Sequence, residues 1–147
     1  MKQVHSCRQR GTVLVEFAIV LPLLALILLV IVDLGLVLRE HQILQNAARE
    51  GARFSSLPAN WVSPKNPNAT TASIQQVVIN YLAQENISVT ADQITVNQQY
   101  PINVGTSTVY GSHVTVSYIR SLLLPAVPLL PAGQVTLTGE STFRNLY

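Results

Sequence analysis

The sequence predicts an α+β protein. A single long N-terminal transmembrane helix continues into a stalk, and a small domain follows, with one further helix and a three- to four-stranded antiparallel sheet. Three observations lead to this fold class. Residues 17–32 form a run of sixteen residues without a charge. Apolar residues then recur with a period of 3.6 from Ile74 to Leu82, as a helix requires. Beyond Asn86, β-branched residues alternate with polar ones, as strands require.

The apolar run is long enough to cross a membrane. Counted from Thr12, it contains twenty-one residues that only Glu16 interrupts. At 1.5 Å per residue this is roughly 31 Å of helix, close to the thickness of the hydrocarbon core. Pro22 lies early in the run and would bend the helix, which membrane helices tolerate. We therefore predict a span in contact with the lipid bilayer.

The charges that flank the run predict its orientation. Lys2, Arg8 and Arg10 precede it and no acidic residue does, so the positive-inside rule keeps the N-terminus in the cytoplasm and exports the remainder. A cleaved signal peptide is the main alternative. The apolar run is longer than the usual signal-peptide core, and no A-x-A-like site follows Val32. Cleavage behind the run is therefore not expected.

Glu16 is the most informative single residue, because a carboxylate at the edge of a lipid-facing helix is costly and indicates a functional partner. If a peptidase cut after Gly11, Thr12 would carry a new α-amine and Glu16 would be the fifth residue of the mature chain. A neighbouring subunit displaced along a helical assembly would then present its α-amine to the carboxylate. The alternative is that Glu16 only marks the interface, where it still reaches water.

A second motif follows the span on what should be the same helix. Its small residues recur at i, i+1, i+4 and i+5, and these are Ala47, Ala48, Gly51 and Ala52. Arg49 and Arg53 share the adjacent face. Small side chains allow another backbone to approach closely. Two interpretations remain open: contact with another subunit, or packing on the chain's own domain.

Taken together, these motifs resemble known families. The N-terminal pattern is similar to the class III prepilin-peptidase site of type IV pilins. It consists, in order, of basic residues, a glycine, four further residues, a glutamate, an aromatic residue and a long apolar run. The string Gln45-Asn46-Ala47-Ala48-Arg49-Glu50-Gly51-Ala52-Arg53 resembles the TadE-like family, the pseudopilins of tight-adherence (Flp) pilus systems. Val15–Leu24 and Asp33-Leu34-Gly35 are similar to the same family. The resemblance covers Arg10 to Arg53 and implies a pilin-like fold.

The resemblance also implies roles for single residues. Gly11 takes the cleavage position, Thr12 the new N-terminus, Glu16 the family's glutamate and Phe17 its aromatic partner. Pro22 and Asp33 join Glu16 as residues of the span and its assembly. The implied function is that of a minor pseudopilin or assembly factor of a Tad/Flp adhesive pilus or related secretion system. About ninety residues follow Arg53, which favours a minor component over the much shorter major subunits.

The implied partners are a prepilin peptidase, other pilin-like subunits and the membrane platform of a Tad-type system. The implied location is the bacterial inner membrane, in a single pass, with the C-terminal domain extracytoplasmic or carried into a pilus. The corresponding domain organisation is a cytoplasmic leader over residues 1–11, the membrane helix and its extension over 12–55, and an extracytoplasmic α+β domain over 56–147.

Within the exported part, the first helix should end near Ser55, because Leu57-Pro58 cannot continue it comfortably. Residues 58–70 are expected to form a loop, after which Thr71 caps the second helix. Gly111-Ser112 is expected to form a turn or a bulge. Ser121 to Pro131 is apolar but contains three prolines. It forms either an apolar patch for a partner subunit or the membrane surface, or a loop over the core.

Several function classes lack support in the sequence. There is no basic stripe with interleaved aromatic residues, so no nucleic-acid partner is expected. Cys7 is the single cysteine, which excludes a disulfide within the chain and a cysteine metal site. No P-loop, nucleophile elbow or zinc spacing is present, so we expect no enzyme and no cofactor. The alternative function is an unprocessed, single-span membrane-anchored binding or regulatory module.

Overall fold

The computed structural model describes residues 6–57, 67–123 and 133–145, and the side chains within 13–57, 71–123 and 133–145. The elements in chain order are α1 (Ser6–Ser55), α2 (Pro67–Gln84), the short 3-10 turn η2 (Ala91–Gln93), β1 (Ile94–Val104), β2 (Ser107–Ser121) and β3 (Gln134–Arg144). A long apolar N-terminal helix, one further helix and a three-stranded antiparallel sheet confirm the predicted α+β class.

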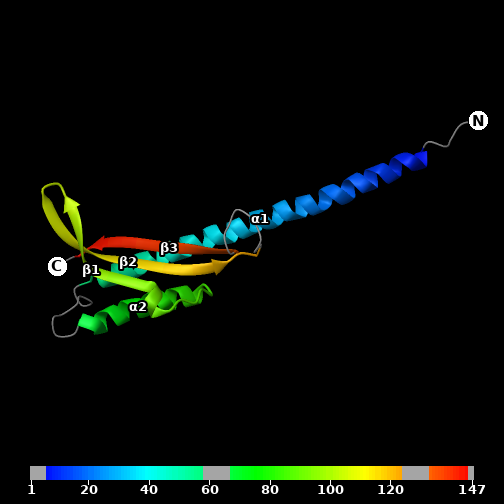
Figure 1. Cartoon of the computed structure of the whole chain (residues 1–147). Coiled ribbons are helices and arrows are strands. Elements are labelled where there is room, and N and C mark those ends of the chain that lie inside the picture. The colour runs from blue at the N-terminus through cyan, green and yellow to red at the C-terminus, as the bar shows by residue number, and fades with distance from the viewer. Residues whose placement is uncertain (1–5, 58–66, 124–132, 146–147) are drawn as a thin grey trace, which may run out of the picture.

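Helix α1 has two halves in different surroundings. Its 50 residues would extend over about 75 Å at 1.5 Å per residue. Figure 1 shows the N-terminal half projecting alone and the C-terminal half lying along the sheet. Every described side chain from Val13 to Val32 is exposed, and Asp33 is the first that is buried. The helix ends at Ser55, as predicted, and the next residue, Ser56, donates its hydroxyl to the Arg53 carbonyl at 2.8 Å.

Helix α2 begins earlier than the sequence suggested. Proline is well suited to the first position of a helix, since it has no amide hydrogen to leave unpaired there. Pro67 takes that role, so Thr71 lies inside α2 and the prediction of a cap at Thr71 was wrong. The last four residues of the predicted loop are helical, and residues 58–66 lie outside the described residues. Ile74, Val78 and Leu82 form its buried face, as their spacing predicted.

The sheet has the order β1-β2-β3 with both pairs antiparallel. Val104 pairs with Ser107, so Gly105 and Thr106 form a two-residue hairpin loop, and Gly105 has the positive φ of +61° that glycine tolerates. The predicted turn at Gly111-Ser112 does not occur, and the bulge lies opposite Ser112, on β1 rather than on β2. Both residues lie within β2, paired on one side with β1 or its bulge and on the other with β3.

The bulge is on the neighbouring strand. Asn97 pairs with His113 and Tyr100 with Gly111, which leaves two β1 residues, Gln98 and Gln99, opposite one residue of β2. A bulge re-aims a side chain, and here Gln98 turns into the domain. Its Nε2 donates to the buried Ser55 Oγ at 2.9 Å, and the buried Ser112 hydroxyl also hydrogen-bonds to Ser55. This polar cluster holds the end of α1 against β1 and β2.

The core lies between α1, α2 and the inner face of the sheet. Its buried apolar side chains come from these three layers and from the segment that follows α2: Leu44, Ala47, Ala48, Ala52, Ile74, Val78, Leu82, Ile87, Val89, Ile94, Val114, Val116 and Leu137. A Cβ on Gly51 would lie 2.5 Å from Val78 Cγ2, and one on Gly139 would lie 2.5 Å from the Leu44 carbonyl oxygen. Such contacts are too short for a side chain, so α1 approaches both α2 and β3 at glycine positions. The small-residue motif of α1 thus packs on the chain's own domain.

Candidate functional site: the membrane helix and its junction with the domain

The exposed half of α1 has the properties of a membrane span. Its apolar window has no share buried within the protein, so it is not the core helix of the domain. Residues 13–32 would span about 30 Å at 1.5 Å per residue, which is the thickness of the hydrocarbon core. The helix is continuous through Pro22. This half of α1 therefore presents an apolar surface that only lipid or other subunits can cover.

The predicted processing residues lie at the start of this half. Gly11 and Thr12 lie within the helical backbone of α1. Glu16 and Phe17 follow on its exposed surface, and Glu16 carries the only ionisable side chain between Val13 and Val32. Among the residues whose side chains are described, none forms a hydrogen bond or an ion pair with Glu16. Within the described side chains, Glu16 is thus exposed and without a polar partner.

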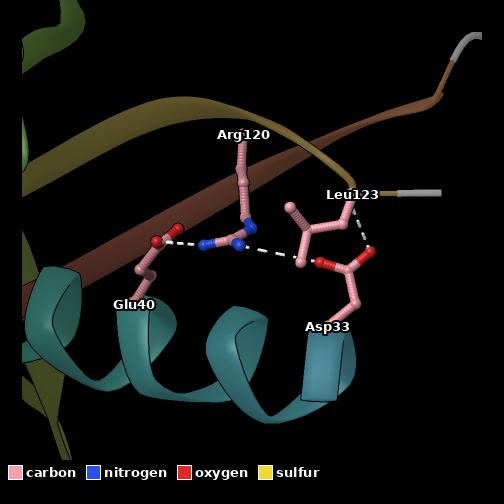
Figure 2. Close-up of polar contacts among 4 residues, drawn as sticks. All are labelled: Asp33, Glu40, Arg120 and Leu123. Carbon is pink, nitrogen blue, oxygen red and sulfur yellow. Dashed lines mark hydrogen bonds and ion pairs between the residues drawn. The ribbon is translucent and has the colours of Figure 1, made fainter. Parts of the chain in front are cut away.

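Asp33 ends the exposed run and begins the contact with the domain. Asp33 and Glu40 are seven residues apart, which places both on one face of α1 about two turns apart. Arg120, from the end of β2, reaches between them (Figure 2). Its Nη2 lies 3.6 Å from Asp33 Oδ1, and its Nη1 donates to Glu40 Oε1. The three side chains are between 8% and 19% exposed, so they form a largely buried charge cluster, here called the junction triad.

A backbone hydrogen bond completes the junction. The Leu123 amide donates to Asp33 Oδ2 at 3.0 Å (Figure 2). One residue earlier, the Leu122 amide donates to the Gly133 carbonyl at 2.8 Å, which closes the connection between β2 and β3. Asp33 therefore ties this end of the sheet to α1 at the residue where the lipid-type surface stops.

The junction triad has more negative than positive charge. Two carboxylates face one guanidinium, for a formal sum of −1. Within the described residues, Asp33 Oδ1, Glu40 Oε2 and Arg120 Nε have no hydrogen-bond partner. Removing three charges from water costs about as much as their mutual attraction returns, especially when hydrogen bonds are missing. The triad is therefore better understood as fixing the position of β2 on α1 than as a large source of stability.

Sequence reasoning found Asp33 but missed its partners. Arg120 is the only Asp, Glu, Lys or Arg between Asp92 and Glu140. A lone charge in so long an uncharged stretch is a signal that could have been read. Glu40 could have been found from its spacing of seven residues from Asp33. The sequence alone does not show that β2 ends beside the turn of α1 that carries Asp33.

The remaining family motif is structural within this chain. Ala47, Ala48, Gly51 and Ala52 are buried. Of the polar members, Arg49 Nη1 donates to Asn46 Oδ1 at 3.5 Å, Arg53 lies 3.8 Å from Glu50, and both arginines are exposed. Gln45 is half-buried beside the core residue Leu44. The small residues thus supply the close packing of α1, and the charged residues supply its outer surface.

Chemistry at the other polar side chains is modest. His113 hydrogen-bonds through Nδ1 to the Thr142 hydroxyl at 2.7 Å and through Nε2 to the Thr115 hydroxyl at 3.0 Å. Its ring stacks on Tyr100 at 4.6 Å between centroids. Throughout the described segments 6–57, 67–123 and 133–145, no three His, Cys, Asp or Glu side chains are grouped so that they could hold a metal ion.

Arg120→Ala should destabilise the full chain by about 3–5 kcal/mol, because the substitution leaves two carboxylates buried without a positive partner. Chemical denaturation in detergent micelles measures the loss in free energy of unfolding. The control is Arg39→Ala, which removes an exposed ion pair with Glu85 at 3.2 Å and should cost less than about 1 kcal/mol. Equal losses for the two variants would contradict the positioning role of the triad.

The comparisons with known proteins agree with the properties of α1. Residues 11–53 match the family model described as TadE-like protein, and this range includes both the span and the packed half of the helix. Comparison with curated proteins and with solved structures found no match. The resemblance to the TadE-like family is confirmed over residues 11–53, and among the described residues one helix is long and apolar enough to anchor the chain in a membrane.

Proposed function

We propose that the chain is a minor pilin-like subunit or assembly factor of a Tad/Flp-type adhesive pilus or related secretion system, processed by a prepilin peptidase between Gly11 and Thr12. One observation carries the proposal. The family match begins at Gly11 and covers most of helix α1. The N-terminal half of this helix is apolar, carries Glu16 and is not covered by the domain. The proposal assigns the chain contacts with other subunits and no catalytic step.

The exposed half of α1 supports a role in contacts between subunits. Because the small-residue motif is already buried in the domain, it offers no surface for a neighbour. Residues 13–32 remain, and they are apolar except for Glu16. Between lipid-embedded helices the hydrophobic effect is weak, so polar contacts and close packing decide which helices associate. Glu16 is then the residue best placed to give such an association a fixed register.

The partner proposed for Glu16 is the α-amine that cleavage creates. An α-amine is protonated at neutral pH, since its ordinary pKa is about 7.7–8.0. Glu16 lies seventeen residues before Asp33, or about 26 Å along the helix, which is close to the cytoplasmic edge of the span if Asp33 marks the other edge. Thr12 lies one turn further toward that edge. A neighbour shifted by about one turn would thus bring its amine to this carboxylate.

The peptidase site is compatible with the helix in which it lies. A peptidase generally binds its substrate in an extended form, so the first turns of α1 would have to open. Glycine lowers the cost of opening, because it disfavours a helix by about 1 kcal/mol relative to alanine. In the family that this chain resembles, a small residue also fits beside the catalytic carboxylates of the peptidase. Lys2, Arg8 and Arg10 would keep this end in the cytoplasm, with the domain on the outer side of the inner membrane.

Gly11→Leu should block processing in cells that contain the peptidase, because leucine cannot occupy the position of the small residue. Intact mass of the protein extracted from native membranes distinguishes the full chain from one that starts at Thr12. Gly35→Leu is the matched control, since nothing lies within 4 Å of a Cβ at Gly35 and processing should continue. Normal cleavage of Gly11→Leu would remove the assignment. A wild-type chain that keeps Met1 would favour the membrane-anchored binding module.

Glu16→Gln should be cleaved normally and impair assembly, because it keeps the shape of the side chain and removes the charge that pairs with the α-amine. The two readouts are intact mass for cleavage and the amount of sheared surface pili for assembly. Glu50→Gln is the control: Glu50 lies on the packed half of α1, 43% exposed beside Arg53. Wild-type amounts of pili with Glu16→Gln would contradict the charge pairing.

A further inference from the structure

The end of the domain that meets the membrane helix has an exposed apolar rim. Leu123, at the end of β2, is 56% exposed, although its backbone is fixed to Asp33. Leu34 and Leu38 are also exposed, on the first turns of α1 after the lipid-type run. These three residues are here called the basal rim. Exposed apolar side chains that gather at one place can mark a contact with a membrane or a partner.

The position of the basal rim follows from helix geometry. If residues 13–32 fill the hydrocarbon core of about 30 Å, Asp33 lies at its edge. Leu34 and Leu38 follow by about 1.5 and 7.5 Å along the axis, a range comparable to the head-group layer of about 5–7 Å. The hydrogen bond of 3.0 Å from the Leu123 amide to Asp33 brings the end of β2 to the same level.

We propose that the basal rim is a lipid-binding surface, and that it seats the domain directly in the boundary between the head groups and acyl chains of the bilayer. Leu34 follows the exposed run of residues 13–32 after Asp33 alone, Leu38 lies about one helical turn beyond it, and the Leu123 amide is bound to Asp33 between them and the run. The domain therefore rests on the membrane, and the turn of α1 at Asp33 is held at a fixed depth.

Charge placement favours lipid as the occupant. No Asp, Glu, Lys or Arg occurs between Arg120 and Glu140, so the chain that leaves and re-enters the sheet at this end is uncharged. The charge of Arg120 itself is buried between the two carboxylates of α1. The first exposed charge on α1 after Val32 is Arg39, about 9 Å beyond Asp33 along the axis. Exposed charges thus begin above the depth that the rim is proposed to occupy.

The test measures depth at four positions of the full chain. Single cysteines replace Leu24, Leu38, Leu123 or Thr106 in a Cys7→Ser background, and each carries a bimane fluorophore. All four side chains are exposed, and Leu123→Cys keeps the amide that binds Asp33. The chains are reconstituted into phosphatidylethanolamine and phosphatidylglycerol vesicles. These vesicles contain lipids with a nitroxide quencher either near the head group or deep in the acyl chain.

The controls are the span and the far end of the sheet. Leu24→Cys should lose fluorescence mainly to the deep quencher. Thr106→Cys, in the hairpin loop that Figure 1 shows at the end of the domain away from the N-terminus, should lose none to either. Leu38→Cys and Leu123→Cys should lose fluorescence mainly to the shallow quencher, and equally at low and high protein-to-lipid ratios.

Three outcomes would overturn the proposal. Leu123→Cys could remain as bright as Thr106→Cys, which would place the rim in water. It could be quenched mainly by the deep nitroxide, which would place it inside the hydrocarbon core. Its quenching could change with protein density, which would make a second copy of the chain the occupant. None of these outcomes bears on processing at Gly11, so the proposed function is tested separately.

Discussion

The structure depends on helix α1, which has a surface suited to lipid in its first half and packs within the domain in its second half. From Val13 to Val32 the surface of α1 is exposed on all sides and, except at Glu16, apolar, as lipid requires. From Asp33 onward one face of α1 is covered by the sheet and α2. The change begins at Asp33, without a linker or a helix break. The Asp33–Arg120–Glu40 triad stands at this point and couples the direction of the membrane helix to the orientation of the domain.

Because α1 also builds the core, anchor and domain are not separable parts. Leu44, Ala47, Ala48 and Ala52 lie at the centre of the buried cluster. The approaches at Gly51 to Val78 and at Gly139 to Leu44 leave no room for an added methyl group. A force or displacement applied to the span in the membrane is therefore transmitted to the sheet through packed backbone. Such rigid coupling suits a subunit whose helix must enter an assembly while its domain keeps a defined orientation.

Local patterns in the sequence predicted the elements, whereas contacts between distant residues could not be predicted. The apolar period gave the buried face of α2, and Leu57-Pro58 gave the end of α1. The start of α2 at Pro67 was missed because a run of Pro and Asn favours a loop and a helix start almost equally. The inward turn of Gln98 depends on a register shift between β1 and β2 that no local pattern specifies. The partnership of Arg120 with Asp33 likewise spans most of the domain.

For the same reason, the sequence could single out Gly11 and Glu16 as candidates but not the junction triad. Glu16 and Gly11 stand out because their spacing from the apolar run is local, and the match to the TadE-like family begins at Gly11. Whether the chain acts as a processed subunit is tested most directly by the N-terminal sequence and intact mass of the wild-type protein taken from its native membrane. The account predicts a chain that starts at Thr12. A chain that starts at Met1 would contradict it and leave a membrane-anchored domain seated on an unprocessed helix.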